Sequence, residues 1–370
     1  MTFDSRKPCP CGQGNTYGQC CENRGDDASG NVIQRGTVRV MLPGTRTEVL
    51  SSMVNGDTRH RIIWNKVWSA PQEQTFHQFL DALVGQTLGH DSFENQKSLA
   101  REEQNAIVRW RSALVSLLDR PTDTSDGGRI RTGPVEAYLS LGYDLFWLQL
   151  VYRLPDRLVQ RLINFEEFQG ARYEILIAAV FARAGFEIDW LDDVIIAGKR
   201  CEFVAVHKRT RTRVSVEAKS HRRGGALHQP GTVEAKTHLK GDIFGLYEKA
   251  LLQGPTDGTP FLIFIDANVP ASFPANALGY SSIPVDTFPW MTEIRDGLVK
   301  KWNTLGGSTV ETGVFITNFA FYYGNDRDAS PIGMCGYFPS PRPIVAFTDS
   351  GTIEDLSYCL RFYAQIPRQF

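Results

Sequence analysis

Residues 201–219 read CEFVAVHKRTRTRVSVEAK, which predicts two antiparallel strands joined by a short basic turn. Successive side chains of a strand point to opposite faces, so Glu217 and Lys219 lie on the same face. The register expected across the turn places Glu202 opposite Glu217, with their Cβ atoms about 4.5–5.5 Å apart. Two carboxylates this close repel each other unless one is protonated or a cation lies between them. The segment therefore predicts a cation site on one face of a sheet.

The candidate catalytic set comprises three acids and one lysine: Glu174, Glu202, Glu217 and Lys219. Mg²⁺ prefers oxygen ligands, and a Mg²⁺ ion held by two carboxylates can polarise a phosphodiester and lower the pKa of its bound water. Lys219 could orient that water or neutralise charge on the phosphate. The alternative for Glu217 and Lys219 is a surface salt bridge on an exposed strand face. For Glu174 the alternative is a helix-end acid paired with Arg172 or Lys199.

The flanking sequence predicts an α/β domain with a mixed sheet. A helix is expected from Arg172 to Ala184, where apolar residues lie on nearly every side, and Gly185 is expected to end it. Pro260–Ile265 is a continuous apolar run, as expected of a central strand covered on both faces. The other elements are expected at Ile188–Trp190, at Asp242–Leu252 as a helix, and at Val314–Tyr323. The order from residue 163 is therefore α-β-β-β-α-β.

This region, residues 163–270, resembles the PD-(D/E)xK nuclease superfamily. Three segments carry the resemblance: the helix opening Phe168–Glu174, the triplet Cys201–Phe203 in place of Pro-Asp-Phe, and Val216–Ser220 at the Glu-x-Lys strand. The resemblance implies a restriction-endonuclease-like mixed sheet flanked by helices. Glu202 departs from the Asp of the family pattern and is longer by one methylene.

The same resemblance implies roles for the candidate residues. It implies that Lys219 is catalytic and that the helix acid Glu174 joins the metal site. It also implies three Mg²⁺ ligands: Glu202, Glu217 and the backbone carbonyl of Ala218. A second Glu-x-Lys tripeptide, Glu234–Lys236, lacks a preceding β-rich run, so the tripeptide alone is a weak signal and its context decides.

Basic residues are concentrated around this segment, although the whole chain has a formal net charge of −1. A local basic surface beside two acids suits a polyanion that crosses a metal site. We therefore expect nucleic-acid contacts from Lys208, Arg209, Arg211, Arg213, His221, Arg222 and Arg223. The alternative is a solvated hairpin tip.

Four of the seven cysteines lie within thirteen residues: Cys9, Cys11, Cys20 and Cys21. Four nearby thiolates can bind Zn²⁺ tetrahedrally, and a unit of about twenty residues would depend on the metal to fold. The cluster resembles the SEC-C zinc motif, which implies structural zinc and docking to a protein or ribosomal surface. The alternative is a cluster of oxidisable loop cysteines.

The length of 370 residues predicts two or three domains. We expect the zinc-binding motif at 1–24, a linker at 25–36, a mainly helical domain of unknown role with a short β start at 37–162, and the nuclease-like domain at 163–370. No signal peptide or membrane-spanning segment is visible in the sequence, so the expected location is the cytoplasm and no membrane partner is expected.

The expected function is a Mg²⁺-dependent endonuclease that hydrolyses phosphodiester bonds, with DNA favoured over RNA as its substrate. By analogy with the family, such an architecture suits host defence. Double-strand cleavage by one such site usually needs two copies, so a homodimer is an open alternative. The rival functions are a catalytically inactive nucleic-acid-binding module and a protein adaptor on the same fold.

Overall fold

The structure is a computed structural model of the chain. It describes residues 38–63, 66–122, 129, 131–151, 154–191, 201–220, 239–268, 289–305, 311–319, 333–341, 347 and 350–370. These residues divide into two compact units. The smaller unit comprises 38–42, 48–76 and 367–370, and the larger unit comprises 43–47 and the described part of 77–366.

The smaller unit is built from two antiparallel sheets. Strands β1 (Arg39–Met41) and β2 (Glu48–Leu50) form one sheet, and β3 (Met53–Asn55), β4 (Thr58–Ile63) and β5 (Lys66–Pro71) form the other. The expectation of a mainly helical region with only a short β start is therefore wrong for residues 39–71. These strands bury few side chains, and β5 buries none fully, so the regular alternation that reveals a half-buried strand is missing.

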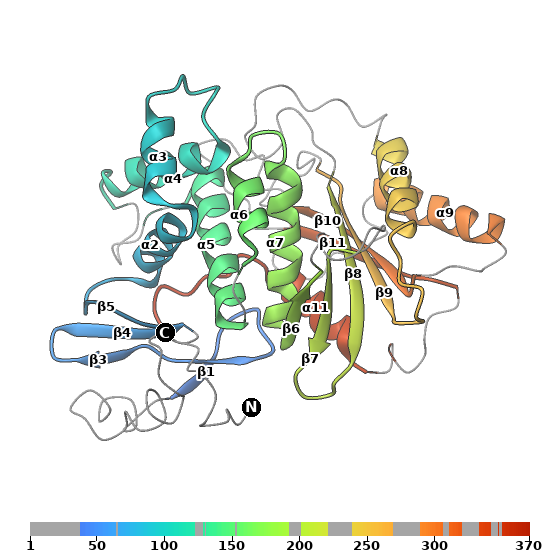
Figure 1. The fold of residues 1–370 in the computed structure, drawn as a ribbon, viewed down its shortest axis with the longest axis horizontal. Coiled ribbons are helices and arrows are strands. Elements are labelled where there is room, and N and C mark those ends of the chain that lie inside the picture. The colour runs from blue at the N-terminus through green and yellow to red at the C-terminus, as the bar shows by residue number, and fades with distance from the viewer. Residues whose placement is uncertain are drawn as a thin grey trace. The chain divides into compact units, whose positions relative to one another are not determined.

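A mixed six-stranded sheet forms the centre of the larger unit (Figure 1). In spatial order the strands are β11 (Gly333–Pro339), β10 (Gly313–Phe319), β9 (Phe261–Asp266), β8 (Arg213–Ser220), β7 (Phe203–His207) and β6 (Phe186–Trp190). Strands β8, β9 and β10 are parallel to one another, whereas β11, β7 and β6 join the sheet through antiparallel pairs.

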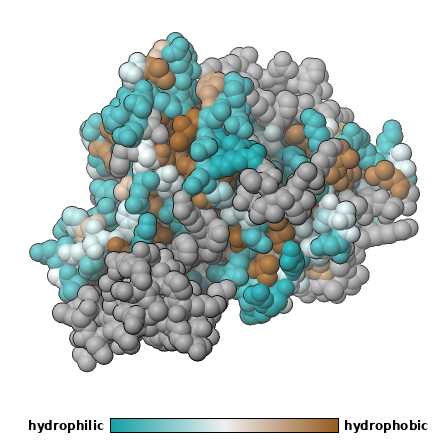
Figure 2. Space-filling model, in the orientation of Figure 1, coloured by the Kyte–Doolittle hydropathy of each residue, from teal (hydrophilic) through white to brown (hydrophobic). Residues whose placement is uncertain are grey.

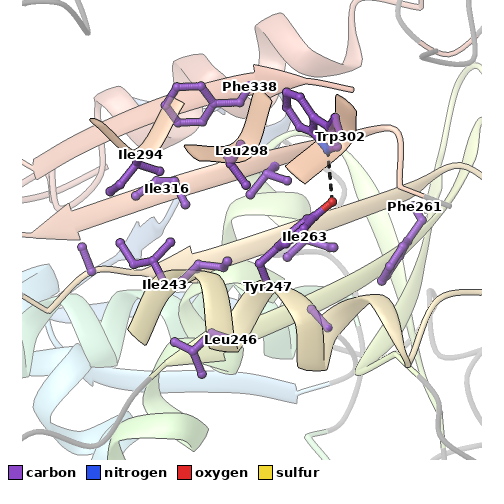
Figure 3. Packing of buried hydrophobic residues seen from close by; sticks show 14 of the residues in the cluster. Ile243, Leu246, Tyr247, Phe261, Ile263, Ile294, Leu298, Trp302, Ile316 and Phe338 are labelled. Carbon is purple, nitrogen blue, oxygen red and sulfur yellow. Dashed lines mark hydrogen bonds between the residues drawn. The ribbon is translucent and has the colours of Figure 1, made fainter. Parts of the chain in front are cut away.

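Helices cover both faces of this sheet. Helix α7 (Phe168–Arg183) packs on one face, where the ring of Phe181 contacts the rings of Phe203 and Phe264. Helices α8 (Leu239–Leu251) and α9 (Pro289–Thr304) cover the other face. Figure 3 shows their apolar side chains packed against alternate residues of β9 and β10. The sheet is therefore the middle layer of a three-layer arrangement.

The order α-β-β-β-α-β is confirmed as α7-β6-β7-β8-α8-β9. Gly185 follows α7 with a φ of 93°, the left-handed conformation that favours glycine. Strand β7 begins at Phe203, two residues later than expected, which leaves Glu202 at the entrance to the strand. An α/β class with a mixed sheet is thus correct.

Further helices pack together with the sheet in the larger unit. They are α2 (Phe76–Leu88), α3 (His90–Lys97), α4 (Ala106–Leu118), α5 (Gly133–Val151), α6 (Asp156–Ile163) and α11 (Thr352–Arg361). The long apolar helix α5 contacts α7 through Asp144, which binds Arg172 and Arg183 in the buried interior. Because residues on both sides of position 162 share this core, no separation between compact units occurs at that position.

None of the described helices is both long enough and apolar enough to cross a membrane. On the face drawn in Figure 2, hydrophobic residues form separate patches between hydrophilic ones. Helix α5 is the longest at 19 residues, and it carries Glu136 and Asp144 among its apolar side chains.

Candidate active site

Strands β7 and β8 bring Glu202 and Glu217 opposite each other, as expected. Phe203 pairs with Val216, and at the turn the backbone N–H of His207 donates to the carbonyl of Thr212 at 2.8 Å. The backbone N–H of Glu202 donates to the Val216 carbonyl at 3.0 Å, so the ribbon extends one residue beyond the strand. This register is the one that the short turn and the alternating side chains predicted.

Lys219 contacts both acids. Its Nζ lies 3.8 Å from Oε1 of Glu202 and forms an ion pair with Oε1 of Glu217. The Glu217 side chain is fully buried, whereas those of Lys219 and Glu202 are 20% and 25% exposed. Three of the four candidate catalytic residues therefore meet at one partly accessible point near the C-terminal end of β8.

Glu174 enters the site from α7 and is held by a residue that the sequence did not indicate. The guanidinium of Arg161 in α6 binds both oxygens of Glu174, at 2.6 and 2.7 Å. The expected partner Arg172 instead binds Asp144 at 2.8 Å, and Lys199 lies outside the described residues. Arg161 belongs to another helix, thirteen residues before Glu174, and no motif relates the two positions.

The acidic side chains of the site are largely removed from water, and they outnumber the basic side chains that pair with them. Burial is the main cause that raises the pKa of Glu202 to about 8, and the charges of Glu174 and Glu217 raise it further. Burial also raises the pKa of Glu217 to about 7, against the opposing effect of the Lys219 ammonium. Three acids thus interact with the two cations Lys219 and Arg161, an arrangement that an added cation would stabilise.

The donor set suits a hard divalent cation such as Mg²⁺. The buried carboxylate of Glu217 forms an ion pair with Lys219 and interacts with the neighbouring acid Glu202. Carboxylate oxygens of Glu202 and Glu217 are the ligand type that Mg²⁺ prefers. Nonetheless, no group of three or more His, Cys, Asp or Glu residues in the described ranges has the geometry to hold a metal ion as it stands. Instead, Lys219 pairs with Glu202 and Glu217, and Arg161 pairs with Glu174.

The basic turn lies away from the acids. Lys208, Arg209 and Arg211 are exposed at the turn between β7 and β8, and Arg211 has a φ of 61°. Glu217 lies six residues further along the strand, which is roughly 20 Å at the rise of an extended chain. The exposed Arg213 begins β8 at the same end. The expectation that this hairpin borders the acids is therefore wrong, because the strand separates them.

Several candidate residues lie outside the described residues. They are the expected zinc ligands Cys9, Cys11, Cys20 and Cys21, and the basic residues His221, Arg222 and Arg223. The expected linker at 25–36 lies there too. The role of each of these residues stays a prediction.

Polar residues at the end of the neighbouring strand were missed. Ser220 pairs with the buried Asp266 at the end of β9, and Asn268 donates a hydrogen bond to the Ser220 hydroxyl at 2.7 Å. A signal for them exists in the sequence, because Asp266 directly follows the apolar run 260–265 and Asn268 comes two residues later. The carboxyl ends of parallel strands are where α/β sheets place their ligand sites.

Two opposed acids, a lysine that contacts both and a third acid held by Arg161 therefore gather charged groups near this end of the sheet. Comparisons of the chain with protein-family models, with curated proteins and with solved structures found no match.

Proposed function

We propose that this protein is a Mg²⁺-dependent nuclease that hydrolyses phosphodiester bonds, with DNA as the favoured substrate. The observation that carries the proposal is the convergence of Glu202, Glu217 and Lys219 at one end of the β7–β8 ribbon. The order α7-β6-β7-β8-α8-β9, with β8 and β9 parallel, supports a restriction-endonuclease-like fold for this part of the chain.

The carboxylates of Glu202 and Glu217 would hold Mg²⁺, together with the backbone carbonyl of Ala218. When bound, the ion would polarise the phosphodiester and lower the pKa of a water molecule. Burial fixes the orientation of Glu217, since its side chain has no exposed surface. The metal would replace the Lys219 ammonium as the counterion of this carboxylate.

Lys219 and Arg161 supply the positive charge of the site. Once released from Glu217, the Lys219 ammonium could bind a phosphate oxygen or orient the attacking water, because it already lies between the two acids. Arg161 holds Glu174 through two parallel hydrogen bonds, which fixes the position of that carboxylate, whose charge acts on Glu202. Arg161 is therefore a positioning residue in this proposal.

A second function is favoured by the same contacts. Lys219 is paired with both acids and Arg161 neutralises Glu174, so the carboxylates have counterions without a metal. A nucleic-acid-binding module or a protein adaptor on this fold would keep such ion pairs. In that case the protein would bind its partner without cleaving it.

The zinc unit and the biological setting complete the proposal. Cys9, Cys11, Cys20 and Cys21 would bind one structural Zn²⁺ and form a module for docking to a protein or ribosomal surface. The cytoplasm, a role in host defence and a homodimer that cuts both strands belong to the same proposal. Metal analysis of the purified protein should find about one zinc per chain, and the substitution Cys20→Ser should remove it.

A plasmid-nicking assay tests the nuclease proposal. Purified protein should nick supercoiled plasmid with Mg²⁺ and stop when EDTA is added. Lys219→Ala should lower the rate by about a hundredfold or more while binding to DNA is retained. Lys236→Ala, in the second Glu-x-Lys tripeptide, is the matched control and should leave the rate unchanged. DNA binding by the wild type without cleavage under any divalent metal would assign the binding function instead.

A further inference from the structure

A cavity of about 430 Å³ opens on helix α4, and it shares no residue with the carboxylate site. Its polar lining consists of one glutamine, three arginines and three hydroxyl residues: Gln104, Arg101, Arg109, Arg120, Ser112, Ser116 and Thr132. Four of these residues repeat every three or four positions along α4 and the residues that follow it. They therefore share one face of the helix, opposite the face that buries Trp110 and Leu114 in the core.

The cavity carries positive charge without a counterion from the described residues that line it. No Asp or Glu is among them. The Nε and Nη2 atoms of Arg109 are shielded from solvent, and they have no hydrogen-bond acceptor within the described part of the chain. Desolvation and the nearby charge of Arg101 lower the pKa of Arg109. Arg109 is half-buried, and an anion from outside the protein could bind these two shielded nitrogens.

The neighbouring arginine on the same helix shows the opposite arrangement. Arg111 binds Asp81, with its Nε 2.9 Å from Oδ1, and Asp81 also accepts a hydrogen bond from the hydroxyl of Tyr138 at 2.6 Å. Hydrogen bonding to Asp81 raises the pKa of Arg111, against the effect of its desolvation. Among the described residues, helix α4 thus has a carboxylate partner for Arg111 and none for Arg109. Arg109 lies in the cavity.

We infer that this cavity binds a compact oligophosphate of the kind carried by nucleotides. Guanidinium groups recognise phosphate oxygens through paired hydrogen bonds, and the hydroxyls of Ser116 and Thr132 could add neutral donors. The volume lies in the range of small-molecule sites, about 300–1,000 Å³. A recess of this size suits a compact ligand better than a nucleic-acid backbone, which binds to an extended basic surface. The inference does not rest on the proposed nuclease activity.

Calorimetric titration in buffer with EDTA tests the site. We expect sodium tripolyphosphate and ATP to bind the wild-type protein with one site per chain and to raise its Tm, while adenosine does neither. Tripolyphosphate that binds as tightly as ATP would identify the phosphates as the recognised group. The absence of saturable binding by both phosphates would overturn the inference.

Matched variants connect the binding to this cavity. Arg109→Gln should weaken tripolyphosphate binding by about tenfold or more, the effect of losing a charge-assisted hydrogen bond. Arg295→Gln removes the same charge from an exposed position on α9 and should change the affinity less than about twofold. Equal losses in both variants would show attraction to net charge alone and would contradict the site.

Two further measurements cover other outcomes. If Arg109→Gln does not fold, Ser116→Glu places a carboxylate in the cavity and should abolish tripolyphosphate binding while leaving the helix intact. A short single-stranded DNA oligonucleotide, measured by fluorescence polarisation, provides the alternative ligand. Binding of DNA that depends on Arg109, without binding of tripolyphosphate, would assign the cavity to a nucleic-acid surface and overturn the inference.

Discussion

Arg172 and Glu174 are two residues apart on α7, yet they belong to charge clusters with opposite balances. In the first cluster, Asp144 receives Arg172 and Arg183 together with the hydroxyl of Tyr363, so one carboxylate binds two cations and a neutral donor. In the second cluster, the acid Glu174 and the two acids of the β7–β8 ribbon interact, within the described part of the chain, with two cations, Arg161 and Lys219.

The difference indicates what each cluster does. Both oxygens of Asp144 accept hydrogen bonds from side chains, and this carboxylate joins α5 to α7. Glu217 is equally buried, but it shares the Lys219 ammonium with the neighbouring acid Glu202. Two acids that share one ammonium are costly to bury unless one is protonated or a further cation binds, which is what a metal site provides.

The largest effect is expected from breaking the first cluster. Asp144→Asn removes the charge that compensates two buried guanidinium groups, so it should lower the free energy of unfolding by about 3–5 kcal/mol. Urea denaturation followed by circular dichroism measures this loss. Asp81→Asn removes a partly exposed partner of Arg111 and should cost no more than about 1 kcal/mol. Similar losses in the two variants would show that burial does not distinguish them.

The second prediction tests whether the other cluster binds Mg²⁺. At a Mg²⁺ concentration a hundred times its Kd, the folded protein should gain about 2.7 kcal/mol of stability. Glu217→Gln keeps the size of the side chain but removes its charge, so this gain should disappear. Thermal unfolding with and without Mg²⁺ measures the difference. A Mg²⁺-dependent gain that survives in Glu217→Gln would locate the ion elsewhere.

A smaller loss is expected from the neutral member of the first cluster. The hydroxyl of Tyr363 donates to Asp144 at 2.6 Å and accepts from Arg172 at 2.7 Å. Tyr363→Phe removes both bonds and should lower the free energy of unfolding by about 2 kcal/mol, less than the loss for Asp144→Asn. Urea denaturation of both variants compares them. An unchanged stability would mean that the two guanidinium groups alone satisfy Asp144.

The smallest effect concerns a third buried carboxylate, whose side-chain donors among the described residues are neutral. Glu311 accepts hydrogen bonds at 2.7 Å from the hydroxyl of Tyr247 and from the indole of Trp302. Figure 3 shows Tyr247 and Trp302 within the apolar cluster beneath α8 and α9. Burial raises the pKa of Glu311 above its ordinary value of 4.5. The unfolded chain therefore loses this proton at lower pH than the folded protein does.

This order of proton loss sets the sign of the pH effect. Well below pH 4.5 the carboxyl of Glu311 is protonated in both the folded and the unfolded state, so no charge has to be buried on folding. As the pH rises from 4.5 through the raised pKa, the contribution of Glu311 to stability decreases, and it becomes constant above that pKa. Glu311→Gln should therefore gain stability relative to the wild type over this window, measured by urea denaturation at several pH values. A difference that does not change with pH would contradict the raised pKa.

Local patterns explain why part of the site could be predicted. Alternating side chains and a short turn restrict β7 and β8 to one register, which places Glu202 opposite Glu217. Arg161 could not be predicted in the same way, because its contact with Glu174 depends on how α6 packs against α7. The role of Asp144 could not be predicted either, because α5 is apolar on nearly every side and the partners of Asp144 come from distant segments.

The sheet topology has a consequence for the way the protein reaches its native state. The β7–β8 hairpin closes over a five-residue turn, whereas β8, β9 and β10 are parallel and need long crossovers between them. Local pairing is fast and distant pairing is slow. We expect the two opposing acids to meet early, while still hydrated. We therefore expect water to leave Glu217 in a later step, when α8 and β9 pack against the hairpin.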